Sequence, residues 1–519
     1  MPLPTHFGLL DWGITALSLV VTLAVGVFVK RYVGGLEDYL VAGRGMGTYV
    51  GTASLVSTEI GIITYMYQAQ FGFLAGFSAF VVGLITILVC FLVGRTGFVI
   101  ARLREMEIMT IPELFERRYT RRVRVLAGVL MAFGGSLNLG IFPIIEARFL
   151  SIVLGIDARY VVWTMAALLL IALAYTAIGG MVSLILTNYV QYLLLAAGTL
   201  VVTVASLRAT GWKAMTAAVG AHMGGHGFDP IHDPGIGPAF ILWQLLLWTA
   251  FMTVWQSVAM RTFSTKDTAT GKKVFTLTSV LFLGRAVIPM AWGIAALAFF
   301  WGQSRPLPPT AGEPPAAEIE RIGADLERDF QPELQQGRLE RLLPRIERIE
   351  ALAGAAGAEG PLAKARARRE ELGMVAMPWM LASILPTGLL GLMMAGMLAA
   401  SLSTYAGYFL GWSSIISQDI VGPCLGRELS GAAKLRLTRA TVIALTAFIM
   451  VWGLIYEVPG PAYFYLQVTA NLFMAPTLVT VVAGLYWKRA SSTGAVLAFL
   501  LGAAASLGYL LPGVGLSVL

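Results

Sequence analysis

The chain has 519 residues, of which 57% are hydrophobic and only 13% are charged, with a formal net charge of +8. Soluble domains carry about 25% charged residues, so this composition excludes a soluble globular protein and indicates a membrane protein. The basic excess does not indicate a nucleic-acid partner, because Lys and Arg gather in short loops between apolar segments.

Apolar runs long enough to cross a bilayer recur along the whole chain. We count about twelve runs of roughly 20 residues or more, at 9–29, 46–71, 74–101, 123–150, 158–178, 181–206, 238–259, 274–301, 378–418, 437–456, 461–487 and 492–512. The run 378–418 is too long for a straight crossing, so we expect a tilted or bent helix that continues into the cytoplasm. The pattern predicts an all-α polytopic membrane protein with about 12 transmembrane helices.

The basic residues alternate between the loops that join these runs. Arg102 and Arg104 follow the third run, Arg261 and Lys266 follow the seventh, and Lys488 follows the eleventh, whereas the intervening short loops are nearly free of Lys and Arg. The positive-inside rule therefore places these loops in the cytoplasm. We expect a multi-pass protein of the cell membrane with its N-terminus and C-terminus outside.

Residues 303–375 interrupt the hydrophobic pattern with a segment rich in Glu, Arg, Ala and Pro. The topology places this segment outside the cell. Its apolar residues recur at helical spacing, which predicts two or three amphipathic helices that form an external cap. A flexible charged loop is the alternative.

The second run places Ser57, Thr58, Glu59 and Thr64 around Gly61 inside a hydrophobic stretch. A glycine among hydroxyl and β-branched residues favours a break in the helix. Broken helices supply free carbonyl oxygens, which bind ions where protein or a cavity surrounds them.

The ninth run carries a small residue at every fourth position, namely Gly391, Ala395, Ala399, Ser403, Gly407 and Gly411. This step keeps the small residues on one helical face, where another helix can approach to backbone distance. The hydroxyls of Ser403 and Thr404 lie near the middle of the stripe, and the carbonyl of Ala400 lies one turn earlier. These oxygens predict a buried sodium site and therefore a transporter.

Several ordered motifs resemble the sodium/solute symporter family. They are YTAIGGMVSLILTNYVQ at 175–191, LPTGLLGL at 385–392, AASLST at 399–404 and Asp419-Ile420. The chain is similar to the sodium/galactose and sodium/proline symporters of that family. The resemblance implies a fold of two five-helix inverted repeats with solute bound near the bilayer midplane.

This fold implies a division of the chain into five parts. Residues 1–45 form an extra N-terminal transmembrane helix and linker, and 46–302 hold the first repeat and the start of the second. Residues 303–375 form the external insertion, 376–490 complete the second repeat, and 491–519 form the C-terminal transmembrane helix.

The resemblance also implies a sodium site made of the carbonyls of Ser57, Ile60 and Ala400 and the hydroxyls of Ser403 and Thr404. In a site with almost no water, these five neutral oxygens can replace the hydration shell of the ion, so no carboxylate ligand is required. The alternative is that both hydroxyls only bond back to carbonyls one turn earlier.

One position departs from the family pattern at this site. Asn188 replaces the usual aspartate of the family signature and supplies no charge. A single coupled sodium is the preferred interpretation, with loss of strict coupling as the alternative.

The substrate site is assigned to Glu59, Thr64, Phe251, Gln256 and Arg285. Glu59 places a carboxylate inside the membrane, which is costly and indicates a function. Four roles are open for it: negative charge near sodium, binding of a substrate amine, uptake of a proton, or a structural role in an ion pair. Arg285 either holds a substrate carboxylate or pairs with Glu146 or Glu59. The polar residues that bind sugar in the sodium/galactose members do not otherwise reappear here.

We therefore predict a sodium-coupled secondary symporter that imports a small polar organic solute by alternating access. Its expected partners are the solute, Na⁺ and the lipid bilayer, and it is not an enzyme. Two alternatives remain at this stage. One is a proton-coupled transporter that uses Glu59, and the other is a solute sensor that keeps the fold without transport.

Overall fold

The computed structural model describes residues 5–29, 35–307, 314–425, 430–458 and 460–510. Parts of the predicted N-terminal linker, external insertion and C-terminal helix lie outside these ranges. Within them the regular structure is helical, and the one β-type contact is an isolated bridge between Met46 and Thr265. In the described part of the chain, ten helical stretches are long and apolar enough to cross a membrane. The prediction of an all-α polytopic membrane protein is confirmed.

The first half of the chain contains α1 (Leu9–Val29), α2 (Leu36–Val41), α3 (Thr48–Thr58), α4 (Ile62–Ala75), α5 (Phe80–Thr96), α6 (Ile100–Glu105), α7 (Ile111–Arg118), α8 (Arg121–Gly140), α9 (Phe142–Leu154), α10 (Val161–Thr210) and α11 (Trp212–Met223). The second half begins with α12 (Gly237–Val254), α13 (Gln256–Ser264), α14 (Thr268–Leu281), α15 (Leu283–Ala286) and α16 (Ile288–Gln303). It continues with α17 (Pro315–Gln335), α18 (Leu339–Ala356), α19 (Glu359–Ile384), α20 (Leu389–Ile415), α21 (Gly422–Cys424), α22 (Gly431–Ile455), α23 (Ala462–Tyr486) and α24 (Ser492–Leu510).

Each half of the transport core begins with a broken helix. The first break separates α3 from α4 at residues 59–61, where Gly61 is extended at φ −117° and ψ 175°. The second break separates α12 from α13 at Trp255, which is extended at φ −65° and ψ 120°. Broken helices at matching positions of the two halves are the mark of an inverted-repeat transporter, so the predicted five-plus-five fold is confirmed.

The half-helix α4 packs against α16 at backbone distance. A Cβ atom on Gly293 would lie 1.8 Å from the carbonyl oxygen of Ala69, and one on Gly72 would lie 2.1 Å from that of Met290. Only glycine fits at either position, as expected where small residues let membrane helices approach closely. This contact fixes the half of the broken helix that follows the break.

Two long helical runs are interrupted. Within α10, Gly180 adopts φ 57° and ψ −161°, which divides the helix into two crossings. The run 378–418, expected to be one tilted or bent helix, is instead two helices, so that prediction was wrong. The helix α19 ends at Ile384, and α20 begins at Leu389 after Pro386 and a positive-φ Gly388 (φ 90°). Proline removes a backbone donor and glycine adopts the left-handed region, so the chain turns there.

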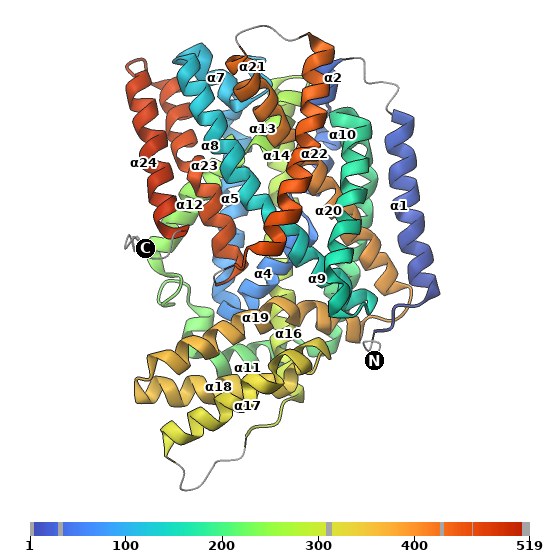
Figure 1. Cartoon of the computed structure of the whole chain (residues 1–519), viewed down its shortest axis with the longest axis vertical. Coiled ribbons are helices and arrows are strands. Elements are labelled where there is room, and N and C mark those ends of the chain that lie inside the picture. Colours follow the sequence, from blue (N-terminus) through green and yellow to red (C-terminus); the bar gives the residue numbers. More distant parts are fainter. Residues whose placement is uncertain (1–4, 30–34, 308–313, 426–429, 459, 511–519) are drawn as a thin grey trace.

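The insertion forms three helices, α17 to α19, that lie with α11 at one end of the bundle, opposite α2, α7 and α21 (Figure 1). The amide of Gln70 in α4 donates to the carbonyl of Glu370 at 2.9 Å and accepts from the backbone NH of Ala462 at 3.2 Å. His222 of α11 faces Glu347 of α18. The three helices are thus docked on the transport core.

Candidate functional site

The break between α3 and α4 faces α20, and its free backbone groups are satisfied by side chains. The NH of Ile62 donates to Ser401 Oγ at 3.1 Å, and the NH of Ile63 donates to Glu146 Oε1 at 3.1 Å. The carboxylate of Glu146 therefore complements the positive end of the α4 dipole.

The five residues predicted to bind sodium meet along this seam and are all at most 2% exposed. Thr404 Oγ1 donates to the Ala400 carbonyl at 3.1 Å and would lie 3.0 Å from a Cβ on Gly61. Ser403 Oγ does not bond back along its own helix but donates to Asn188 Oδ1 at 2.7 Å. The alternative in which both hydroxyls only bond back one turn earlier therefore describes Thr404 alone. Ser57 Oγ donates to the backbone carbonyl of Asn188 at 3.0 Å.

Asn188 joins three helices through its amide. Its Oδ1 accepts from Ser403 of α20, and its Nδ2 donates to Ser54 Oγ at 3.1 Å and to Thr58 Oγ1 at 3.0 Å, both on α3. A carboxylate would keep the acceptor and lose these donated bonds. The local chemistry therefore suits an amide at the position where the family signature has aspartate.

Arg261 is the residue that the sequence placed wrongly. It was expected in a cytoplasmic loop, but it lies in α13 with 0% exposure. Its Nη2 donates to Thr58 Oγ1 at 2.5 Å, and its Nη1 donates to the Ser257 carbonyl and hydroxyl, both at 3.0 Å. Among the described residues no carboxylate lies within 4.0 Å of it. Membrane burial of such a cation is costly and marks a functional region.

These donors fix the direction of the hydroxyls in the seam. Thr58 Oγ1 accepts from both Arg261 and Asn188, so its own proton is directed to Ser403 Oγ at 3.3 Å. Ser403 then gives its proton to Asn188 Oδ1, which leaves one lone pair of its oxygen free. Thr404 gives its proton to Ala400 and keeps both lone pairs. The two hydroxyls can therefore act as cation ligands without breaking these bonds.

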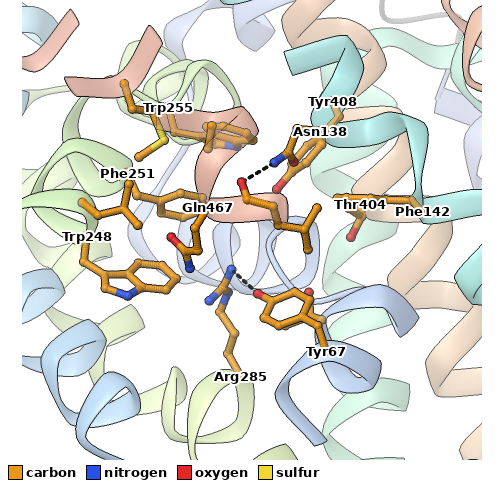
Figure 2. A pocket seen from close by; sticks show the side chains of 15 residues that line it. Tyr67, Asn138, Phe142, Trp248, Phe251, Trp255, Arg285, Thr404, Tyr408 and Gln467 are labelled. Atoms are coloured by element: carbon orange, nitrogen blue, oxygen red, sulfur yellow. Dashed lines mark hydrogen bonds between the residues drawn. The ribbon is translucent and has the colours of Figure 1, made fainter. Parts of the chain in front are cut away.

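A small cavity lies beside the seam (Figure 2). Its volume is about 50 Å³, well below the roughly 300–1,000 Å³ of typical ligand pockets. Most of its wall is aromatic or aliphatic, and its polar lining residues are Thr64, Tyr67, Asn138, Arg285, Thr404, Tyr408 and Gln467. Phe251 stacks on Trp255 with ring centroids 5.3 Å apart, and both lie on the wall.

Arg285 lines the cavity, whereas Glu59 does not, and the two residues do not form an ion pair. Arg285 Nε donates to the backbone carbonyl of Glu59 at 2.8 Å, and its Nη2 faces Tyr67 Oη at 3.5 Å. The Glu59 carboxylate accepts from the hydroxyl of Tyr408 at 2.9 Å. Within the described part of the chain, neither Glu59 nor Glu146 lies within 4.0 Å of the Arg285 guanidinium. The expected pairing of Arg285 with either carboxylate is therefore absent there.

The other predicted substrate residues divide into two groups. Thr64 and Phe251 line the cavity with Arg285, whereas Gln256 does not. Gln256 Oε1 accepts from the backbone NH of Ile111 at 3.1 Å, and its Nε2 faces the carbonyl of Met109. Its amide thus ties α13 to the segment that begins α7.

The sequence interpretation missed five aromatic residues of the cavity wall: Tyr67, Phe142, Trp248, Trp255 and Tyr408. One signal was available, because Tyr408 lies four residues after Thr404 and therefore shares its helical face. The same rule applies to Tyr67, three residues after Thr64 in α4, and to Trp248, three residues before Phe251 in α12. Phe142, at the start of α9, and Trp255, at the break between α12 and α13, are placed by the tertiary structure.

A model of the sodium:solute symporter family matches residues 39–307 and 346–502. The sodium/glucose cotransporter of Vibrio parahaemolyticus is 23% identical over 514 residues, which cover 94% of this chain and 82% of that protein. The sodium/myo-inositol cotransporter 2 of Rattus norvegicus is 31% identical over 130 residues, 25% of this chain and 19% of that protein.

A solved structure of a Na⁺-coupled sialic acid symporter in a substrate-bound outward-open state superposes with a TM-score of 0.74 at 18% identity. It covers 97% of this chain and 92% of that one, so the two proteins share a fold. With the family match over most of its length, the chain belongs to the sodium:solute symporter family, whose members are sodium-coupled transporters of small solutes and not enzymes.

Proposed function

We propose that sodium binds in the seam between the α3–α4 break and α20, and that a small polar organic solute binds in the adjoining cavity. The ion ligands are the carbonyls of Ser57, Ile60 and Ala400 and the hydroxyls of Ser403 and Thr404. Thr64, Phe251 and Arg285 contact the solute from the cavity wall, and Glu59 shapes the site through Tyr408 and Arg285.

The observation that carries this proposal is the position of Thr404, which belongs to both sites. Its side chain lines the cavity, while its hydroxyl lies against Gly61 in the helix break. An ion that binds Thr404 and the carbonyls of the break orders one wall of the solute cavity. Binding of either ligand then favours binding of the other, which is the thermodynamic requirement for coupling.

In this proposal the chain crosses the cell membrane with its N-terminus and C-terminus outside. The helices α17 to α19 then form an external cap, and α2, α7 and α21 lie at the cytoplasmic end, as their opposite positions in Figure 1 support. Sodium and solute enter together from outside and leave to the cytoplasm after one repeat moves against the other. The inward sodium gradient supplies the free energy for solute accumulation.

The division of the chain stays a prediction of the same kind. Residues 1–45 and 491–519 flank the two repeats, the repeats occupy 46–302 and 376–490, and the cap occupies 303–375. The family match omits 308–345, which supports an insertion at this point.

A thermal-shift screen of the purified protein tests the proposal. We expect sodium alone to raise the midpoint of unfolding, and a transported solute to raise it further only when sodium is present. Potassium and choline at the same ionic strength are the controls. A midpoint that follows pH and ignores sodium would select the proton-coupled alternative, and solute binding without accumulation in vesicles would select the sensor.

A further inference from the structure

The Arg285 guanidinium has hydrogen-bonding capacity that the protein does not use. The side chain is 3% exposed and lines the cavity. Its Nε is satisfied by the Glu59 carbonyl and its Nη2 makes one long contact with Tyr67, but Nη1 has no partner. A buried N–H group without an acceptor is costly. In Figure 2 the guanidinium points into the space between Gln467 and Tyr67.

Neither guanidinium near the cavity is paired with a carboxylate. Arg261 and Arg285 both lie near the carboxylate of Glu59, which accepts from Tyr408 and pairs directly with neither. Glu146, the second carboxylate near the break, accepts from the backbone NH of Ile63 at the start of α4 and lies within 4.0 Å of neither guanidinium in the described part of the chain, and Asn188 carries no charge. Sodium in the seam would add a further positive charge close by.

From the free Nη1 group and the lack of a paired carboxylate at Arg285, we propose that the solute is a small organic monocarboxylate and that Arg285 binds its carboxylate group. The inference rests on the proposed function, because it names the substrate class of the same cavity. Arg285 Nη1 and Nη2 present the paired donors that match the two oxygens of a carboxylate. The bound anion supplies the missing acceptor and pairs directly with the Arg285 guanidinium.

The rest of the wall limits the remainder of the solute. Trp248 and Phe251 lie under the guanidinium, with its central carbon 4.9 Å and 5.4 Å from their ring centroids. Phe142 and Met474 add apolar surface, and the cavity is about 50 Å³. This wall suits a short apolar chain. The cavity is also well below the volume of typical ligand pockets, which favours a solute smaller than a hexose.

The test compares acids with their amides, which have nearly the same shape but no charge. Purified wild-type protein in detergent is titrated with acetate, propionate, lactate and pyruvate, and with acetamide, propionamide, lactamide and pyruvamide, each with and without sodium. Glucose and myo-inositol are included as neutral polyols. We expect at least one acid to raise the unfolding midpoint in a sodium-dependent way, with its amide at least about tenfold weaker.

Two variants localise the effect. Arg285→Gln should weaken binding of the acid at least about tenfold while sodium alone still shifts the midpoint, and Arg285→Lys should lie between it and the wild type. Arg148→Gln is the matched control, because Arg148 is an exposed arginine of α9 outside the cavity lining. If Arg285→Gln does not fold, the comparison of acids with amides in the wild type still tests whether the solute is a carboxylate.

The outcomes separate the two proposals. Sodium-dependent binding of an amide as tight as its acid, or of the polyols alone, overturns the carboxylate assignment and leaves the sodium-coupled site intact. An acid that binds equally well to the Arg285→Gln variant overturns the role of Arg285. Absence of any shift with sodium contradicts the proposed function itself.

Discussion

Replacement of Thr404 by valine tests the ion site most directly, because it removes one oxygen and little else. Valine keeps the branched shape of threonine. The hydroxyl of Thr404 donates only to the Ala400 carbonyl of its own helix, which already accepts within the helix. The variant therefore leaves no new buried polar group without a partner, and the free energy of unfolding without sodium should change by less than about 1 kcal/mol.

The expected loss of sodium affinity follows from the contact removed. A hydrogen-bond-strength contact to a charged group contributes roughly 1.5–3 kcal/mol, so the dissociation constant for sodium should rise about 10- to 150-fold. Ser403→Ala should lose a similar amount of sodium affinity and also become less stable by about 1–3 kcal/mol. Its hydroxyl satisfies Asn188 Oδ1 at 2.7 Å, and that acceptor would remain buried without its donor.

Binding of ²²Na⁺ to the purified variants measures the affinity, and thermal unfolding without sodium measures the stability. Thr446→Val in α22 is the matched control, because Thr446 is buried and donates to the carbonyl four residues earlier at 2.9 Å, as Thr404 does. If Thr404→Val binds sodium as tightly as the wild type and Thr446→Val, the ligand role of Thr404 is refuted.

Three further predictions concern packing, the external cap and the charge moved. Gly293→Ala should prevent correct folding, because its Cβ would lie 1.8 Å from the Ala69 carbonyl oxygen. Gly302→Ala on the same helix is the control and should be tolerated, because its Cβ meets nothing within 4 Å. The yield of monodisperse protein measures the effect of each substitution. In the cap, the guanidinium groups of Arg328 and Arg345 lower the pKa of Asp329 to about 2. Asp329→Asn should therefore lower the unfolding midpoint at neutral pH, and its difference from the wild type should vanish as the pH falls from 4 toward 2; an unchanged difference at pH 2 would contradict the ion pairs. Finally, one sodium with one monocarboxylate moves no net charge, so uptake into proteoliposomes should not respond to a valinomycin potential, whereas a neutral solute would gain about 2.3 kcal/mol per 100 mV.

The sequence predicted the membrane fold, the helix break and the seam because each depends on local chemistry. Gly61 among hydroxyl residues marked the break, and the stripe of small residues through Ser403 marked the face that meets it. The same stripe explains the close approach, because a Cβ on Gly407 would lie 2.3 Å from Thr58 Cγ2. Each of these features depends on residues that lie close together in the sequence, so each can be predicted without a structure.

The sequence could not place Arg261 or Gln256, because their surroundings come from distant segments. Arg261 is followed closely by Lys266, and the pair looks like the basic loop that the positive-inside rule describes. The break at Trp255 instead starts a new buried helix, which carries Arg261 to Thr58 on α3. Gln256 lies next to that break, and its side-chain oxygen accepts a hydrogen bond from the backbone NH of Ile111, so the side chain does not line the cavity.

The position of Arg261 gives a physical reason for the amide at Asn188. The guanidinium and the Asn188 Nδ2 group both donate to Thr58 Oγ1, and this forces the Thr58 proton toward Ser403 and the Ser403 proton toward Asn188 Oδ1. The hydrogen bonds from residue 188 to Thr58, from Thr58 to Ser403 and from Ser403 back to residue 188 form a ring. This ring requires that residue 188 both donates and accepts, which an amide does and a carboxylate does not. The orientation of the Ser403 oxygen is thus set by a fixed cation and a neutral amide, without a carboxylate in the chain of hydrogen bonds.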